Sequence, residues 1–414
     1  MDSHAILALG LGVAPPWHLV EQRLDTTVAP HVLHLTVAAE RGATFACPVC
    51  GRPCKAHDFA DFTWRHLNFF QHHCHITARV PRTACPDHGV RRITVPWARE
   101  GSRFTLLFEQ AALVLVREMP VLAAARIMEI TDTRLWRIVM HYVEQAVARL
   151  DLSALCAVGF DETAAQRVHS YDTVFIDMDR KDKPVVFVTP GRGKDTVARF
   201  KVFLARQGGD AGHVVEAVCD MSGAFIAAVG EVFPNAAVTV DWFHVVQLFT
   251  KALDEVRRAE AKSTRLPKAL RWAILKRAEG RLTRAQAEAL AELEASDLAT
   301  ADAWRIKEKL RWVRKAASRH AARWRLTHFL RHARAIIGTN PILKPMQKAL
   351  TTLARHSRRI LERWTSSHST ARLESLNGLF QAARSRARGY RNTTTFATMI
   401  YLIAAPIGAL LEST

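Results

Sequence analysis

Acidic residues that follow apolar segments are the residues of this 414-residue chain best suited to chemistry. Asp161 follows the apolar segment 157–160, and Asp220 follows the apolar segment 214–219. A carboxylate at the end of a buried strand lies at the rim of its sheet, where it can share a divalent cation with a neighbour, and Mg²⁺ prefers such oxygen ligands. Two ions about 3.5–4 Å apart can activate a water or a 3′-hydroxyl and stabilise the leaving oxygen of a phosphodiester.

A third carboxylate from a helix would complete such a site. Our candidate is Glu374, within the segment Ala-Arg-Leu-Glu-Ser-Leu-Asn at 371–377. Aspartates at strand ends also form turns and cap helices, and this alternative applies most strongly to Asp241. Spacing alone therefore leaves the metal-binding set open.

A second cluster combines cysteine and histidine. Cys47-Pro-Val-Cys50 is a C-x-x-C pair and Cys85-Pro-Asp-His88 is a C-x-x-H pair, which together supply the four tetrahedral ligands of a structural zinc ion. We find no secretion signal and no disulfide-like spacing, so the cluster indicates a metal in a reducing cytosol. The ligand set is not unique, because other residues of these types lie between the pairs: Cys54, His57, His72, His73, Cys74 and His75.

The charge of the chain indicates its partner. There are 58 Lys and Arg residues against 39 Asp and Glu residues, with a net charge of +19, and such an excess attracts nucleic acid. No segment reaches the roughly 20 apolar residues of a membrane span, so we expect 396–411 to be a buried terminal helix. Arginines and lysines in two clusters are candidates for phosphate contacts, although a solvated basic face is the alternative for any one of them: Arg305, Lys307, Arg311, Arg314 and Lys315, then Arg384, Arg386, Arg388 and Arg391.

Periodicity predicts the elements that position these residues. Residues 1–45 alternate polar and apolar side chains as two strands of a small sheet do. A short helix at 121–129, a turn at 130–132 and a longer helix at 133–150 have the outline of a helix-turn-helix.

The middle of the chain alternates strands with helices. We expect strands at 157–160, 173–178, 184–189, 214–219 and 237–240, with helices at 194–206 and 223–232. This order predicts a mixed α/β sheet covered by helices. From about 262 to 360 only helices are expected, including a long basic helical run at 302–333, and a last helix carries Glu374.

Several blocks in this order resemble the bacterial insertion-sequence transposases of the ISL-three family, over nearly the whole chain. The zinc pairs and the helix-turn-helix resemble the family's N-terminal domains. Four blocks resemble its catalytic domain: Gly159-Phe160-Asp161-Glu162, Asp220-Met221-Ser222-Gly223, Asp241-Trp242-Phe243-His244 and Leu373-Glu374-Ser375-Leu376-Asn377.

The resemblance implies a ribonuclease-H-like core interrupted by a helical insertion, and cleavage and transfer of DNA strands with Mg²⁺ or Mn²⁺. It implies Asp161, Asp220 and Glu374 as metal ligands, with Asp241 and His244 in a supporting or DNA-contacting role. Asp241 is the alternative second ligand. Glu162 is a rival to Asp161, but its side chain should point to the opposite face of the strand.

The chain is therefore predicted to be a multidomain α+β protein. We expect a β and zinc-binding domain at 1–98, a helix-turn-helix domain at 99–152, the first part of the catalytic core at 153–261, a helical insertion at 262–362 and the last core helices at 363–414. The expected partners are terminal inverted repeats, target DNA and a second copy of the chain, in the bacterial cytoplasm at the nucleoid. A non-catalytic DNA-binding regulator and a nuclease without strand transfer are the alternative functions.

Overall fold

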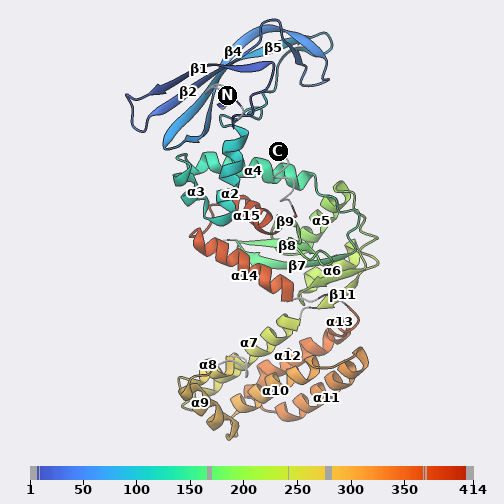
Figure 1. Ribbon diagram of the computed structural model, residues 1–414. Coiled ribbons are helices and arrows are strands. Elements are labelled where there is room, and N and C mark those ends of the chain that lie inside the picture. Colours follow the sequence, from blue (N-terminus) through green and yellow to red (C-terminus); the bar gives the residue numbers. More distant parts are fainter. Residues whose placement is uncertain are drawn as a thin grey trace. The chain divides into compact units, whose positions relative to one another are not determined.

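The computed structural model describes residues 7–8, 10–165, 170–240, 242–275, 282–366, 368 and 371–406, apart from the side chains of residues 371 and 374. The described residues form two compact units, 7–142 and 143–406, whose elements are labelled in Figure 1. Asp241 and the Glu374 side chain lie outside the described residues.

The first unit begins with a six-stranded sheet in the order β1-β2-β5-β4-β3, with β6 paired to β5. Alternate residues of β2 and β5, such as Leu35 and Ile76, are buried in its core, as the period of two requires. The two strands expected in the first 45 residues are confirmed by β1 and β2, whereas the long hairpin of β4 and β5 was not foreseen. The strands are β1 (Trp17–Asp25), β2 (Val32–Ala39), β3 (Thr44–Ala46), β4 (Pro53–Phe69), β5 (His72–Cys85) and β6 (Gly89–Arg92).

Three helices follow: α2 (Leu106–Glu118), α3 (Val121–Ile127) and α4 (Asp132–Ala148), the last of which begins in the first unit and ends in the second. Pro120 separates α2 from α3, since proline cannot continue a helix. The Thr131 side chain accepts a hydrogen bond from Arg134 N at 3.4 Å at the start of α4. The short helix, turn and longer helix expected here are confirmed.

A fully buried carboxylate holds these helices together. Glu109 of α2 accepts hydrogen bonds from Arg99 Nε at 2.8 Å, from Ser102 Oγ at 2.7 Å and from Tyr142 Oη of α4 at 2.7 Å. Burying a carboxylate is costly unless it is paired and hydrogen-bonded, and here all of these partners belong to the first unit.

The second unit is built on a five-stranded sheet in the order β11-β10-β7-β8-β9. Its first three strands along the chain form an antiparallel meander, and β10 is parallel to both β7 and β11. The strands are β7 (Ala157–Ala164), β8 (Tyr171–Asp177), β9 (Val185–Pro190), β10 (Glu216–Cys219) and β11 (Ala237–Val240).

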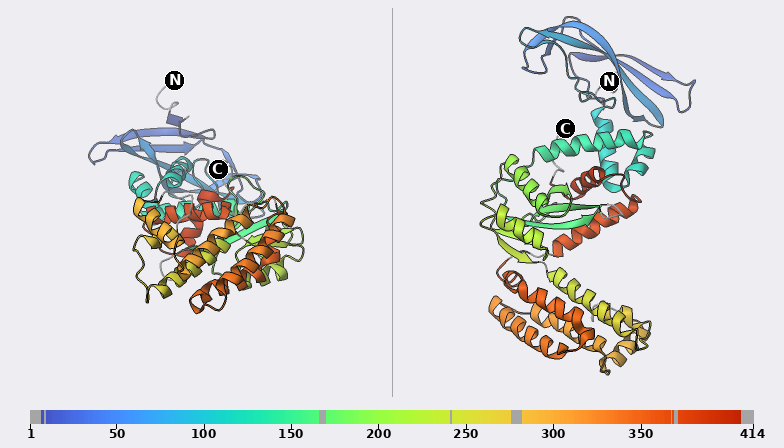
Figure 2. Two further views of the ribbon diagram at one scale, coloured as in Figure 1. Left: turned by 90° about the horizontal axis from the view of Figure 1, so that it is seen from below. Right: turned by 180° about the vertical axis from the view of Figure 1, so that it is seen from behind.

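Helices cover both faces of this sheet. Phe160 packs against Phe225 with ring centroids 5.1 Å apart, on the face covered by α5 (Lys194–Arg206) and α6 (Gly223–Val232). On the other face lie α14 (Ala371–Arg386) and α15 (Thr393–Ala404), and Tyr401 Oη of α15 accepts a hydrogen bond from Val188 N of β9 at 2.8 Å. Figure 2 shows α14, in red, lying along the strands.

The second unit also has an all-helical core, to which α7 to α13 contribute. The basic helical run expected at 302–333 is formed by two helices, α10 and α11, with a short break between Arg314 and Arg319. The helices are α7 (Trp242–Glu260), α8 (Leu270–Leu275), α9 (Arg284–Glu294), α10 (Ala299–Arg314), α11 (Arg319–Ile337), α12 (Lys344–Arg355) and α13 (Ser357–Glu362), with a 3₁₀ turn η1 (Pro341–Leu343). Within the described residues, no helix is both long enough and apolar enough to cross a membrane.

Candidate metal centres

Four cysteine and histidine side chains converge in the first unit. The ligand atoms of Cys47, Cys50, Cys85 and His88 all lie within 4.8 Å of one another. The first pair stands in the turn before β4, and the second begins at the last residue of β5. The β4–β5 hairpin thus brings together two pairs that are far apart in sequence.

The spacing of these atoms fits a tetrahedral zinc ion. Zinc lies about 2.3 Å from sulfur and about 2.0 Å from nitrogen, which sets ligand-to-ligand edges of about 3.5–3.8 Å. Cys50 Sγ lies 3.7 Å from Cys85 Sγ, and His88 Nδ1 lies 3.5 Å from Cys85 Sγ and 3.9 Å from Cys47 Sγ. A hydrogen bond with His88 lowers the pKa of Cys85 to about 6, which favours the thiolate that a metal requires.

The competing residues are engaged elsewhere. Cys54 Sγ donates to the carbonyl oxygen of Arg52 at 3.4 Å. Cys74 is buried in the apolar core of the sheet, and burial raises its pKa to about 11. His73 Nε2 lies 2.6 Å from Glu129 Oε2. None of the three belongs to the four-ligand group.

The second candidate centre lies where β7 and β10 run side by side. Their parallel register pairs Ala217 with Val158 and Val218 with Gly159. The same register, continued by two residues, would set Asp220 beside Asp161. Asp220 directly follows β10, as expected, whereas Asp161 lies inside β7 rather than at its end. The reason is that the antiparallel pairing of β7 with β8 continues to Ala164, while its pairing with β10 stops at Gly159.

The Asp161 carboxylate is held by residues from two other elements. Asn377 Nδ2 of α14 donates to Asp161 Oδ2 at 2.7 Å. The backbone N–H of Glu162 donates to Asp161 Oδ1 at 2.8 Å, and His244 Nε2 of α7 lies 3.8 Å from the same oxygen. The structure therefore brings His244, expected in a supporting role, next to Asp161.

Successive turns of helix α14 contact alternate residues of strand β7. A Cβ on Gly159 would lie 3.3 Å from Leu373 Cδ1 and only 2.5 Å from Met178 Sδ, so glycine permits the close approach of the helix. Further along, Asn377 contacts Asp161, and Gln381 Nε2 donates to Thr163 Oγ1 at 2.9 Å. Four helical residues and two strand residues both advance the chain by about 6 Å, which explains the match.

Asp220 and Asp161 both affect the pKa of Glu162, so the three carboxylates lie near one another. Burial, and next the charge of Asp220, raises the pKa of Glu162; the charge of Asp161 adds to this, and Arg192 and His244 oppose it. Asp220 itself accepts a hydrogen bond from Ser222 N at 2.8 Å. Glu162 follows Asp161 in the strand, so its side chain points to the face that Phe160 shares with α6.

The remaining ligand candidates are placed only in part. The backbone of Glu374 lies in α14, three residues before Asn377. Asp241 stands between β11 and α7, outside the described residues. Asn377 and Gln381 were not singled out from the sequence, although Asn377 is the last residue of the block that contains Glu374, and their spacing of four places them on one face of a helix.

The basic candidates fall into two groups. Lys307 is 8% exposed and its amine donates to the carbonyl oxygen of Ile274 at 2.9 Å, so it stabilises the helical core and is poorly placed for DNA. Arg305 pairs with Asp302 at 3.0 Å, Arg311 with Glu308 at 3.3 Å, and Arg384 donates to Ala164 O at 3.0 Å. The others are exposed: Arg314, Lys315, Arg386, Arg388 and Arg391.

Comparison with known proteins agrees with this arrangement. Residues 158–400 match a family described as "Transposase", residues 93–143 match the "Helix-turn-helix domain of transposase family ISL3", and residues 43–88 match the "zinc-finger of transposase IS204/IS1001/IS1096/IS1165". The last match spans both zinc-ligand pairs and supports a structural zinc ion there.

Individual relatives carry transposase names. The chain is 31% identical over 215 residues to the transposase for insertion sequence element IS1557 of two Mycobacterium tuberculosis strains, which covers 51% of this chain and 48% of each relative. The chain thus spans about half the length of these two relatives. It is 25% identical over 366 residues to the transposase for IS1001 of Bordetella parapertussis, covering 84% of this chain and 86% of the relative. The chain belongs to the ISL3 family of transposases.

Proposed function

We propose that this chain is an active DNA transposase that cleaves and joins DNA at the terminal inverted repeats of an insertion sequence. Asp161, Asp220 and Glu374 are its metal-binding carboxylates. Two observations carry the proposal. The parallel register of β7 and β10, continued by two residues, sets Asp220 opposite Asp161, and Asn377 of α14 donates a hydrogen bond to Asp161.

The sheet supports a ribonuclease-H-like core. Three antiparallel strands come first along the chain, and two parallel strands then extend the sheet from the side of β7. Helices α7 to α13 separate these strands from α14 in sequence, which is the arrangement expected of a helical insertion. Glu374 stands three residues before Asn377, and residues with this spacing are neighbours on a helix.

The donor set fits a hard divalent cation. Carboxylate oxygens are the ligands that Mg²⁺ and Mn²⁺ prefer, and the metal would supply Lewis acidity at the phosphodiester. Asn377 and the N–H of Glu162 fix the orientation of Asp161, and Ser222 N fixes that of Asp220. These hydrogen bonds orient the carboxylates of Asp161 and Asp220 in the absence of DNA. His244, 3.8 Å from Asp161, is placed to contact Asp161 or a DNA phosphate.

DNA recognition is assigned to the first unit and to exposed basic residues. We propose that the zinc unit and α4 read the ends of the element, because a helix of this kind fits the major groove. Arg314, Lys315, Arg386, Arg388 and Arg391 would contact phosphates, which makes binding salt-dependent. Joining two ends favours a dimer on DNA.

The test is cleavage of end-sequence DNA in Mg²⁺. Asp161→Asn, Asp220→Asn and Glu374→Gln should each lower the cleavage rate by about 10³-fold, since loss of the metal removes several kcal/mol of transition-state stabilisation, while DNA binding persists. Asp182→Asn is a matched control, because Asp182 is an exposed aspartate of the same unit, and it should cleave normally.

The other outcomes identify the alternatives. Undiminished cleavage in all three variants would contradict the proposed site. DNA binding without any metal-dependent cleavage by the unsubstituted chain indicates a regulator, and cleavage without joining in a strand-transfer assay indicates a nuclease. Comparing Asp220→Asn with Asp241→Asn decides which aspartate is the second ligand.

A further inference from the structure

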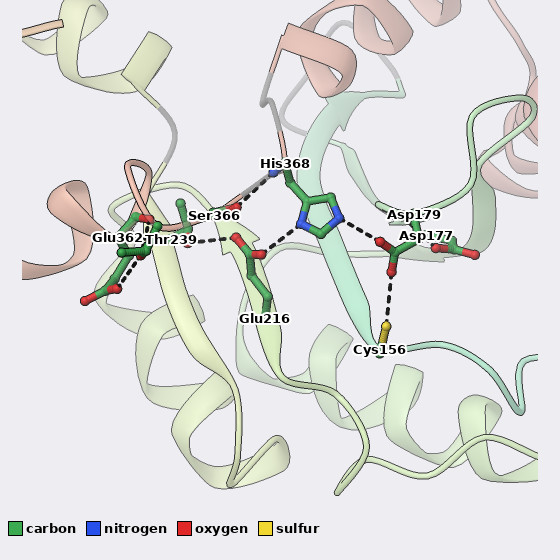
Figure 3. Close-up of polar contacts among 9 residues, drawn as sticks. Cys156, Asp177, Asp179, Glu216, Thr239, Glu362, Ser366 and His368 are labelled. Atoms are coloured by element: carbon green, nitrogen blue, oxygen red, sulfur yellow. Dashed lines mark hydrogen bonds and ion pairs between the residues drawn. The ribbon is translucent and has the colours of Figure 1, made fainter. Parts of the chain in front are cut away.

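His368 connects the segment between α13 and α14 to the sheet of the second unit. Its Nδ1 lies 2.8 Å from Glu216 Oε2, and its Nε2 lies 2.9 Å from Asp179 Oδ1. Figure 3 shows the ring between the two carboxylates. The side chains of His368 and Glu216 are each 13% exposed, so the contact between them is largely shielded from solvent, whereas the Asp179 side chain is 51% exposed.

Both carboxylates are themselves held in place. Glu216 is the first residue of β10, and its Oε1 accepts a hydrogen bond from Thr239 Oγ1 of β11 at 3.0 Å. Asp179 follows β8, and its Oδ2 accepts a hydrogen bond from Cys156 Sγ at 3.1 Å. The His368 ring therefore connects the chain before α14 to Glu216 of β10 and to Asp179 after β8 (Figure 3).

This cluster, which we call the His368 clasp (His368, Glu216 and Asp179), lies at the opposite end of β10 from Asp220. Asp220 lies four residue steps along the chain from Glu216, a distance of about 13 Å in an extended strand. Three residues after His368 the chain enters α14, which then advances along β7 from Gly159 to Thr163. The clasp stands at the start of the helix that carries Glu374 and Asn377.

The clasp requires a charged ring. A neutral imidazole has one N–H donor, whereas imidazolium has two, and ionised carboxylates only accept. Both ring nitrogens face carboxylate oxygens, so only imidazolium can donate to Glu216 and Asp179 together.

The surrounding charges agree with a charged ring. Burial lowers the pKa of His368, but the hydrogen bonds and charges of Glu216 and Asp179 together raise it by more, so that the pKa lies above its ordinary value. Two further carboxylates labelled in Figure 3 are paired with arginines: Asp177 with Arg180 at 3.7 Å, and Glu362 of α13 with Arg319 at 2.5 Å.

We propose that His368 is a positioning residue whose charged ring, held between Glu216 and Asp179, fixes the start of α14 on β7 and thereby the place of Glu374 beside Asp161 and Asp220. This inference rests on the proposed function for its catalytic consequence. Its structural consequence, the attachment of α14, is independent of that function.

The sign of the pH dependence follows from the raised pKa. The stabilisation by the clasp is complete below the ordinary pKa of histidine, about 6.5, and is lost as the pH rises through the pKa of His368 in the folded chain. Attachment of α14 should therefore weaken on the alkaline side.

Two variants separate charge from packing. His368→Gln offers one donor and one acceptor group, so it cannot donate to both carboxylates at any pH. Glu216→Gln is compatible with a neutral His368 ring. The oxygen of the introduced amide can accept from Thr239, and the amide nitrogen can donate to Nδ1 of the ring. The ring then donates through its own Nε2–H to Asp179. His213→Gln is the matched control, an exposed histidine 3.9 Å from Asp210.

The experiment is hydrogen exchange of the full chain at pH 6 and pH 9, after correction for the intrinsic effect of pH. In the unsubstituted chain and in His213→Gln, α14 amides should exchange about tenfold faster at pH 9 than at pH 6, consistent with the loss of one charge-assisted hydrogen bond. His368→Gln should show fast exchange at both pH values, and Glu216→Gln slow exchange at both. Equal α14 protection in all four chains would overturn the proposal, even if cleavage requires the three carboxylates.

Cleavage in Mg²⁺ provides the second measurement. The unsubstituted chain should lose cleavage on the alkaline side, and Glu216→Gln should retain it there. If the exchange pattern appears and no chain cleaves DNA, the clasp stands and the proposed function fails. If cleavage occurs with the same pH profile in Glu216→Gln and the unsubstituted chain, the catalytic role of the clasp is contradicted.

Discussion

Asn377 donates a hydrogen bond to Asp161 across 216 residues of sequence, with Nδ2 and Oδ2 2.7 Å apart. This contact joins α14 to β7 at the carboxylate that we propose as a metal ligand. It is one of a row of contacts, since Leu373 lies against Gly159 and Gln381 donates to Thr163. The helix is therefore positioned along the strand at several points rather than at one.

Asn377→Ala should lower Mg²⁺-dependent cleavage by about 10–100-fold, because a residue that orients a metal ligand typically contributes this much to metal affinity or activity. Higher Mg²⁺ should restore part of the rate. Titration of cleavage against Mg²⁺ measures the effect. Gln381→Ala, one turn further along α14, is the control and should need no additional Mg²⁺; an unchanged Mg²⁺ dependence in Asn377→Ala would show that the contact does not support Asp161.

Replacing a zinc ligand should release the metal and disrupt the first unit. We expect Cys50→Ser and His88→Ala to lose zinc and end-DNA binding, because structural zinc contributes about 10–16 kcal/mol to the folding of small zinc domains. Zinc content by mass spectrometry and a gel-shift assay check this. Cys54→Ala should keep both properties, since Cys54 Sγ bonds to the Arg52 carbonyl oxygen instead; loss of zinc from Cys54→Ala would overturn the assigned ligand set.

Removing the buried carboxylate of α2 should destabilise the first unit. Glu109→Ala leaves Arg99 without its buried partner, which typically costs about 3–5 kcal/mol. Tyr142→Phe removes only one hydrogen bond to a charged group, worth about 1.5–3 kcal/mol. Urea unfolding measures both, with Glu100→Gln as an exposed control, and the prediction fails if Glu109→Ala unfolds at the midpoint of that control.

A buried aspartate predicts pH-dependent stability of the second unit. Asp172 of β8 is fully buried, and neither of its carboxylate oxygens has a hydrogen-bond partner within the described part of the chain. Burial raises its pKa to about 6 from 3.8. Folding then favours the protonated form, so the free energy of unfolding should fall as the pH rises from about 4 to about 6, by up to about 3 kcal/mol.

Asp172→Asn should remove this decrease. Urea midpoints at pH 4.5 and pH 7.5 measure the effect as a difference between the two chains, which cancels other titrating groups. Asp182→Asn, exposed in the turn after β8, should behave like the unsubstituted chain. Equal pH dependence in Asp172→Asn and the unsubstituted chain would show that Asp172 is not ionised on unfolding in this range.

Local patterns predicted much of the second unit. Apolar segments bounded by turn residues located β10 and β11, and amphipathic spacing located α5 and α6, to within two residues. Patterns could not show that Asp161 lies inside its strand, because the length of β7 is set by its pairing with β8 as far as Ala164. A strand's end depends on its partners, and these are distant in sequence.

The zinc ligands show the same limit. The C-x-x-C and C-x-x-H pairs were recognisable because each is local. The choice between them and Cys54 or Cys74 depended on the long β4–β5 hairpin, in which Cys74 turns into the apolar core of the sheet. His368 carried no recognisable local signal, since its partners Glu216 and Asp179 lie 152 and 189 residues away.

The order of the two units along the chain has a consequence during synthesis on the ribosome. The described residues of the first unit end at Tyr142, so the zinc cluster and α4 up to that residue are complete before the sheet of the second unit is made. The helix with Glu374 and Asn377 emerges only after α7 to α13 have been translated. A ribosome that stops early therefore releases a chain that holds the zinc cluster and most of the helix-turn-helix but lacks Glu374 and Asn377. If these domains read the ends of the element as we propose, we expect such a fragment to compete with longer chains for the same DNA ends.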